Sequence, residues 1–242
     1  MGEVGKGGHS TLRLQRERNI ASSNRHNQPP MFSIVTGPSC PTGKTHRMDG
    51  RDDQPDTTVA IVLAAGAGTR FTGPGHKLDA TIDGRPLAVI TVDTAVASAI
   101  GPVVVVVGDH DLPGLPAAAH VVHNPRWADG QITSVHVGIE AARDLGATAV
   151  VIGLADQPFV TAEAWRAVAA STSPIAVATY DGRRGNPVRL DDSTWPLLPD
   201  EGDEGARVLM RVRPDLVEPI PCRGSAVDID TLEDLERWQS NS

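Results

Sequence analysis

The stretch "VLAAGAGTRFTGPGHK", residues 62–77, follows directly from an apolar run and holds four glycines and two cations. A glycine turn behind a strand is typical of two different sites. One is the turn of a dinucleotide-binding fold, and the other is a loop that holds a nucleoside triphosphate through backbone N–H groups and cations. The two sites predict different enzymes, so the residues around the glycines must separate them.

The dinucleotide turn fails at two positions. Its third glycine, which allows close packing of helix on strand, is replaced here by Phe71. The acid that should bind a ribose roughly 20 residues beyond the turn is also missing, because the acid that ends the next expected strand is Asp109, about twice as far away. The sequence therefore favours a phosphate-holding loop.

Arg70 and Lys77 supply the cations that such a loop needs, because they can neutralise charge on phosphoryl oxygens. Lys77 is the only lysine after residue 57, in a segment that otherwise uses arginine. The alternative is a solvated surface lysine, which is the usual place of a lone charge. The sequence by itself leaves both interpretations of Lys77 open.

From residue 57 onward, short β-rich runs alternate with helical patterns, which predicts an α/β fold with a mostly parallel sheet flanked by helices. The expected strands are 58–64, 102–108, 118–123, 147–154, 174–180, 186–190 and 225–230. The expected helices are 86–100, 131–145, one that begins at Thr161, 204–212, and 231–239, which starts with the capping-box pair Thr231 and Asp234. Ligands of such sheets bind at the carboxyl ends of the strands.

Composition limits the function classes. With 242 residues, 40% of them hydrophobic, the chain is long enough for one well-buried domain. A net charge of −8 argues against nucleic-acid binding, and no apolar run approaches the roughly 20 residues of a membrane helix. The two cysteines, Cys40 and Cys222, lie far apart in the sequence and indicate no disulfide framework. We expect a cytoplasmic protein with no nucleic-acid or membrane partner.

Residues 1–56 are polar, interrupted by Gly, Pro, Ser and Asn, and without sustained periodicity. We expect them to form a disordered or poorly ordered tail before a single domain at 57–242. Met31 and Met48 lie in this tail, so we also expect the natural chain to begin near Met48. Intact-mass measurement of natively produced protein checks that start.

Acidic residues follow two of the expected strands. Asp156 stands in "GLADQP", after the strand 147–154, and Asp228 and Asp230 stand at the end of "SAVDID". Carboxylates at strand ends can ligate Mg²⁺ while waters and substrate phosphates fill its other positions. A turn or cap role is the alternative for Asp156 alone, but converging strand-end carboxylates fit phosphoryl or nucleotidyl transfer.

Six motifs in this order resemble the molybdopterin cytidylyltransferase-like branch of the nucleotidyltransferases: "LAAGAGTRF…K", "NPRWADGQITSVHVGI", "GLADQP", "GNPV", "GDEGAR" and "DIDTLEDL". They extend over most of residues 57–242. The resemblance implies a Rossmann-like nucleotidyltransferase domain, a triphosphate such as CTP, Mg²⁺, and a pterin phosphate, molybdopterin, as acceptor. A molybdoenzyme or its maturation factor is the protein partner that it implies.

Carried over position by position, the resemblance assigns four groups of residues. The catalytic group is Arg70, Lys77 and Asp156, and the metal ligands are Asp156 with Asp228 or Asp230, between which the sequence does not choose. The nucleotide-binding group is Leu63, Ala64, Ala65, Gly66, Gly68, Asn124, Gly130 and Ser134. The acceptor-binding group is Asn186, Asp203 and Arg207.

Some positions depart from the family pattern. Asn186 stands where a histidine is common, Leu232 where a proline is common, and Asp79 where an apolar residue is usual. These changes remove no catalytic charge, so they put the acceptor in question more than the reaction. In the pattern of the related family, Ala65 favours CTP over GTP as the triphosphate. Three alternatives stay open: a non-catalytic nucleotide or cofactor carrier, an oxidoreductase for heteroaromatic compounds, and transfer to another phosphorylated acceptor.

Overall fold

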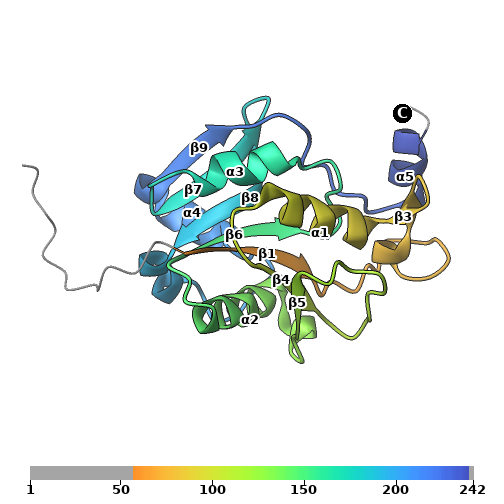
Figure 1. Cartoon of the computed structure of the whole chain (residues 1–242), viewed down its shortest axis with the longest axis horizontal. Helices are drawn as coiled ribbons and strands as arrows, with labels where there is room; N and C mark the ends of the chain where they lie inside the picture. The colour runs from red at the N-terminus through yellow and green to blue at the C-terminus, as the bar shows by residue number, and fades with distance from the viewer. Residues whose placement is uncertain (1–56, 240–242) are drawn as a thin grey trace, which may run out of the picture. The chain divides into compact units, whose positions relative to one another are not determined.

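The computed structural model describes residues 57–239 (Figure 1). The expectations of a disordered tail and of a start near Met48 concern residues outside this range. The described residues form one seven-stranded sheet in the order β5-β4-β1-β6-β8-β7-β9, plus a small antiparallel pair of strands. The sheet strands are β1 (Thr58–Ala64), β4 (Val103–Val107), β5 (Ala119–His123), β6 (Ala149–Leu154), β7 (Ile175–Tyr180), β8 (Arg183–Asp191) and β9 (Val217–Pro221).

The sheet is parallel except at β8, which runs antiparallel to both β6 and β7. The strands β1, β4 and β6 form its centre and are buried almost throughout, as their unbroken apolar runs predict. Their register pairs Leu63 with both Val106 and Leu154, so the three strands end at the same edge. The residues that follow them therefore emerge together.

Helices cover both faces of the sheet, as Figure 1 shows. On one face, α1 (Leu87–Ser98) and α3 (Ala162–Ala169) bury Val92 and Trp165 against alternate strand residues such as Val62. On the other face, α2 (Gln131–Asp144) and α4 (Arg207–Val212) bury Ile139 and Met210 with Ile61. This arrangement confirms the predicted α/β fold, with a mostly parallel sheet between helices.

The remaining elements are short. They are η1 (Lys77–Asp79), β2 (Thr81–Ile82), β3 (Arg85–Pro86), η2 (Trp127–Asp129), η3 (Asp192–Leu197), η4 (Pro214–Leu216) and α5 (Leu232–Gln239). α5 starts with the predicted capping box: the Asp234 backbone N–H donates to Thr231 Oγ1 at 3.1 Å, and the Thr231 N–H donates to Asp234 Oδ2 at 3.0 Å. Between residues 57 and 239, no helix is both long and apolar enough to cross a membrane.

The predicted last strand, residues 225–230, is wrong. This segment is irregular and lies across the carboxyl end of the sheet, where the Ile229 N–H donates to the carbonyl of Asp156 at 3.0 Å. The strand that closes the sheet is β9, which pairs with β7 at its edge. β9 contains Pro219 and Pro221, and an edge strand tolerates prolines because one row of its backbone groups needs no partner in the sheet.

Candidate functional site

Three loops meet at the carboxyl edge of the sheet. The glycine loop follows β1, the loop around Asp156 follows β6, and the segment 225–230 crosses beside them. Backbone hydrogen bonds join them: the Ala155 N–H donates to Leu63 O and the Ile229 N–H donates to Asp156 O, both at 3.0 Å. Residues far apart in the sequence are thus held at one place.

Lys77 lies at the centre of these loops. Its Nζ donates to Asp156 Oδ2 at 2.6 Å and to Asp230 Oδ1 at 3.0 Å, and only 11% of its side chain is exposed. Burial by itself lowers the pKa of the Lys77 ammonium, but the charges and hydrogen bonds of Asp156 and Asp230 outweigh it and raise the pKa above its ordinary value. Lys77 is therefore a fixed cation, and the interpretation of a solvated surface lysine does not hold.

Arg70 supplies a second cation with a different environment. Its Nη1 lies 2.7 Å from Asp230 Oδ2, while 76% of its side chain is exposed. Arg70 can leave this ion pair at little cost, because exposed pairs contribute about 0–1 kcal/mol. A buried lysine and an exposed arginine thus share one carboxylate.

One oxygen of the Asp156 carboxylate is left without a partner. Its Oδ1 is buried and has no hydrogen-bond partner, which is costly unless a ligand satisfies the oxygen. Among the described residues, no three His, Cys, Asp or Glu side chains are grouped so as to hold a metal by themselves. One or two carboxylates fit Mg²⁺, which keeps waters and substrate phosphates as its other ligands.

Asp228 and Asp230 have separate surroundings, which the sequence could not distinguish. Asp230 faces Lys77 and Arg70, whereas Asp228 accepts a 2.7 Å hydrogen bond from Gln157 Nε2. Burial raises the pKa of the Asp228 carboxyl, and the negative charges of Asp156 and Asp230 raise it further. Asp230 and Asp156 both hold the Lys77 ammonium and therefore lie close together, which makes Asp230 the better candidate for a second ligand beside Asp156.

A cavity of about 330 Å³ opens next to Asp156. Its lining includes five residues predicted to bind the nucleotide, namely Leu63, Ala65, Gly66, Gly130 and Ser134. We name it the nucleotide cavity. Ala64 instead lines a neighbouring cavity of about 250 Å³, on the β4 side of the glycine loop.

Gly68 allows the glycine loop to pack on Lys77. Its φ is +60°, and a Cβ at this position would lie 3.0 Å from Lys77 Cβ.

Asn124, also predicted to border the nucleotide, has a different place. It is buried, and its Nδ2 donates to Thr133 Oγ1 and Ser134 Oγ, both at 2.9 Å. Its Oδ1 accepts from the Arg126 N–H at 2.9 Å. With these groups in use, Asn124 fixes the first turn of α2, from which Ser134 faces the nucleotide cavity.

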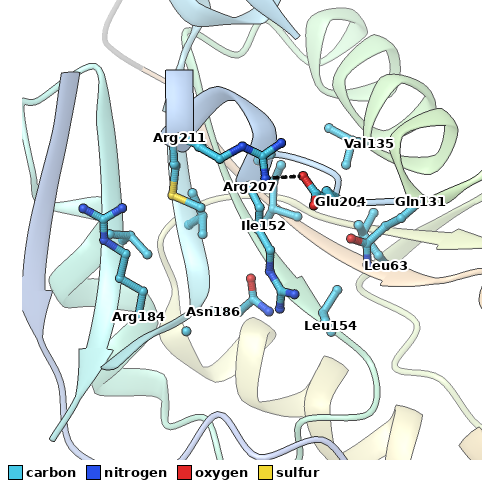
Figure 2. Close-up of a pocket in the computed structure, with 15 residues that line it drawn as sticks. Leu63, Gln131, Val135, Ile152, Leu154, Arg184, Asn186, Glu204, Arg207 and Arg211 are labelled. Carbon is cyan, nitrogen blue, oxygen red and sulfur yellow. Dashed lines mark ion pairs between the residues drawn. The ribbon is translucent and has the colours of Figure 1, made fainter. Parts of the chain in front are cut away.

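A larger cavity of about 400 Å³ adjoins the nucleotide cavity, and the two share Leu63, Gln131 and Leu154 (Figure 2). We name it the acceptor cavity, because Asn186 and Arg207, both predicted to contact the acceptor, line it. Figure 2 shows the Arg207 guanidinium extending into it on the side of the Asn186 amide. Asp203, the third predicted residue, lies in the nucleotide cavity instead.

The acceptor cavity combines an apolar floor with a cationic rim. Its apolar residues include Ile152, Val177 and Met210. Arg211 at the rim forms a 2.7 Å ion pair with Glu204, drawn as a dashed line in Figure 2. The rim thus presents arginines to a ligand, one of them already paired.

Sequence reasoning missed several residues of the site. Gln157 donates to Asp228 and accepts from Asn186 Nδ2 at 3.1 Å, so it connects a residue of the acceptor cavity to the acidic segment 225–230. Gln131 and Trp127 line the nucleotide cavity, and His76 and His110 flank the glycine loop. Their positions inside or beside the quoted motifs were the available signal, but their side chains suggested no particular chemistry.

Comparison with known proteins identifies the family. Residues 60–218 match the family model described as a MobA-like NTP transferase domain. "Nicotine blue oxidoreductase" of Paenarthrobacter nicotinovorans is 31% identical over 78% of this chain and 98% of its own length. "Purine catabolism protein PucB" of Bacillus subtilis (strain 168) is 29% identical over 74% of this chain and 94% of its own.

Solved structures show the same fold. A nucleotidyl transferase from Methanothermobacter thermautotroptrophicus superposes with a TM-score of 0.64 at 21% identity, covering 77% of this chain and 98% of that one. Rv0371c from Mycobacterium tuberculosis gives 0.63 at 23% identity over 76% and 98%, and a structure of Rv0371c has been solved with manganese. The chain, whose family match covers most of the described residues, belongs to the MobA-like NTP transferases.

Proposed function

We propose that the protein transfers a nucleoside monophosphate, CMP from CTP in preference, to a phosphorylated acceptor of the molybdopterin type and releases pyrophosphate. The observation that carries the proposal is the position of Lys77 between Asp230 and Asp156, the second of which lines the nucleotide cavity. A buried cation between two carboxylates is an arrangement for neutralising phosphate charge beside a metal ion.

Asp156 and Asp230 would hold the metal, and the buried, unpartnered Oδ1 of Asp156 supports this assignment. Bound Mg²⁺ would supply charge neutralisation on the triphosphate oxygens. Two facts about the family support a divalent metal at this site. Its members are typically dependent on divalent metals, and Rv0371c was solved with manganese.

The reaction needs positioning more than proton transfer. An oxygen of the acceptor phosphate forms a bond to the α-phosphorus of CTP, and the bond from that phosphorus to the oxygen bridging to the β-phosphorus breaks. The electron pair leaves with pyrophosphate. Because the attacking phosphate is ionised near neutral pH, it needs no general base. Lys77 and Arg70 neutralise the charge that grows on the leaving pyrophosphate.

The lining of the acceptor cavity would fit a ligand with a flat ring and anionic groups. Its apolar floor suits a heteroaromatic ring. Two arginines of its lining, Arg184 and Arg207, suit phosphate or thiolate groups, because neither guanidinium forms an ion pair with a described residue. A neighbour of the fold is named an inositol-1-phosphate CTP transferase from T. maritima, with a TM-score of 0.58 at 17% identity. That name makes CTP a reasonable first triphosphate to test.

An oxidoreductase acting on a heteroaromatic compound is the second candidate. The relative named "Nicotine blue oxidoreductase" favours it, and the apolar acceptor cavity would accept such a ring. Against it, the glycine loop lacks the third glycine of a dinucleotide turn and carries Arg70 and Lys77. A non-catalytic carrier is less well supported, because it would not need a fixed cation between two carboxylates.

The deciding experiment measures pyrophosphate release with each of the four ribonucleoside triphosphates and Mg²⁺, with and without molybdopterin. The proposal expects release that requires both CTP and molybdopterin. Release in no combination would favour the carrier. Flavin-like absorbance of the purified protein, or reduction of a heteroaromatic dye without triphosphate, would favour the oxidoreductase.

A further inference from the structure

His76 precedes Lys77 and touches the glycine loop on one side and η1 on the other. Its Nε2 lies 3.2 Å from Gly66 O, and its Nδ1 accepts a 3.3 Å hydrogen bond from the Leu78 N–H. His76 is also the N-cap of η1, the short helix that carries Lys77. One imidazole therefore connects a wall of the nucleotide cavity to the cation of the site.

A second histidine supports the first. His110, in the loop after β4, stacks on His76 with ring centroids 4.1 Å apart and an interplanar angle of 18°. Its Nε2 lies 2.8 Å from Asp79 Oδ2, at the other end of η1. We name His76, His110 and Asp79 the histidine clip, because together they hold η1 against the loops that follow β1 and β4.

The contacts of His76 require one protonation state. Nδ1 must be unprotonated to accept from the Leu78 N–H, and Nε2 must carry the hydrogen to donate to Gly66 O. A second proton would place an N–H on Nδ1, facing the donor of Leu78. The charged groups that face His76 are His110, Lys77 and Asp79, and only Asp79 would favour the imidazolium.

We propose that His76 is a positioning residue for the triphosphate: in its neutral form it fixes Gly66 and Lys77 in the geometry that binds phosphate, and its protonation breaks the Leu78 contact that caps η1 and so releases Lys77. This inference rests on the proposed function, since it takes a nucleoside triphosphate as the ligand. It adds to that function that the affinity for nucleotide falls at acid pH, because of a residue that does not touch the reacting atoms.

The environment of His76 agrees with this role. Burial lowers the pKa of the His76 imidazole below its ordinary value of about 6.5, and His110 lowers it further. The unfolded chain therefore binds more protons than the folded one between the two pKa values, so acidification through this range destabilises the fold. Above it, His76 stays neutral and the histidine clip stays closed.

Steady-state kinetics with varied CTP, saturating molybdopterin and Mg²⁺ from pH 5 to 8 tests the proposal. If only the neutral form binds, KM for CTP rises by up to about tenfold per pH unit below the pKa, and kcat changes little. His76→Asn keeps an N-cap acceptor for Leu78 but does not titrate, so its KM should be higher at pH 8 and should lose the acid rise. His110→Gln should move the acid rise to higher pH, because it removes a group that lowers the pKa of His76.

His120→Asn is the matched control, because His120 is exposed on β5, outside the histidine clip. It should keep the wild-type profile, including any slope that comes from titration of CTP itself. An acid rise in His76→Asn equal to that of the wild type and the control would overturn the proposal.

A second readout needs no activity. The NMR signals of the His76 ring and of the Leu78 amide should titrate together in the wild type, and the Leu78 amide of His76→Asn should show no such step. An amide that ignores the ring titration would overturn the inference. If CTP binds at no pH, the proposed function fails. If CTP binds but the His76→Asn profile is unchanged, only the role of His76 fails.

Discussion

Replacing Lys77 by methionine removes the cation at the centre of the site and keeps a side chain of similar length. The Lys77 ammonium holds Asp156 at 2.6 Å and Asp230 at 3.0 Å, and those carboxylate side chains are only 18% and 21% exposed. In the variant Asp156 loses its counter-charge, and Asp230 keeps only the exposed Arg70. Both the stability of the fold and its interaction with triphosphate should therefore suffer.

The two losses differ in size. Removing one partner of a fully buried ion pair costs about 3–5 kcal/mol, and the remaining exposure of these groups reduces this to about 2–3 kcal/mol. For a domain of this size that is a fall in Tm of roughly 5–10 °C. Loss of a cation that stabilises charge in the transition state should lower kcat/KM about 10²–10³-fold.

Thermal unfolding and pyrophosphate release, measured on the same preparations, separate the two losses. Arg85→Met is the control, because Arg85 forms an exposed ion pair with Asp93 away from the site. This substitution should lower the free energy of unfolding by at most about 1 kcal/mol and leave turnover unchanged. Millimolar Mg²⁺ should restore more of the Tm in Lys77→Met than in the control, since the freed carboxylates gain a cation. A folded Lys77→Met protein with wild-type turnover would refute the role of Lys77.

Three further substitutions test other parts of the site and core. Asp156→Asn should abolish the Mg²⁺-dependent rise in Tm and lower turnover about 10²-fold or more, whereas a variant that still responds to Mg²⁺ would exclude Asp156 as a ligand. Gln157→Leu breaks the link from Asn186 to Asp228, so KM for the acceptor should rise several-fold with little change in KM for CTP; equal changes in both would contradict this. Trp165→Ala empties a fully buried site and should cost about 3–5 kcal/mol in chemical denaturation.

The central sheet and the main site loops could be predicted from the sequence because their signals are local. An unbroken valine run such as Val103–Val107 fits a strand buried on both faces, and the strands of a parallel sheet must end at one edge. This rule was enough to bring Lys77 near Asp156, 79 positions away.

The errors came where contacts across the fold outweigh local pattern. Residues 225–230 alternate like a strand, yet their backbone bonds to the loop around Asp156, and β9 pairs as an edge strand despite Pro219 and Pro221. The position of Asp203, predicted to bind the acceptor, was also not visible in the sequence, because it depends on the packing of its loop on the start of α2; its role stays a prediction.

The roles of Asp228 and Asp230 could not be separated from sequence for a similar reason. They stand two positions apart in an irregular segment and differ in their distant partners, which are Gln157 for Asp228 and Lys77 with Arg70 for Asp230. The same holds for His76, whose contacts depend on Gly66 and on the stack with His110. Side-chain pairing across loops sets these roles, and no sequence spacing encodes it.

The most direct test of nucleotidyl transfer follows the fate of each phosphorus. Wild-type protein is incubated with molybdopterin, Mg²⁺ and CTP labelled at either the α- or the γ-phosphorus, and the products are separated. We expect α-label to move to the acceptor and γ-label to appear in pyrophosphate, with neither transfer in Asp156→Asn. α-Label that stays in CTP, or γ-label released as single phosphate, would contradict it.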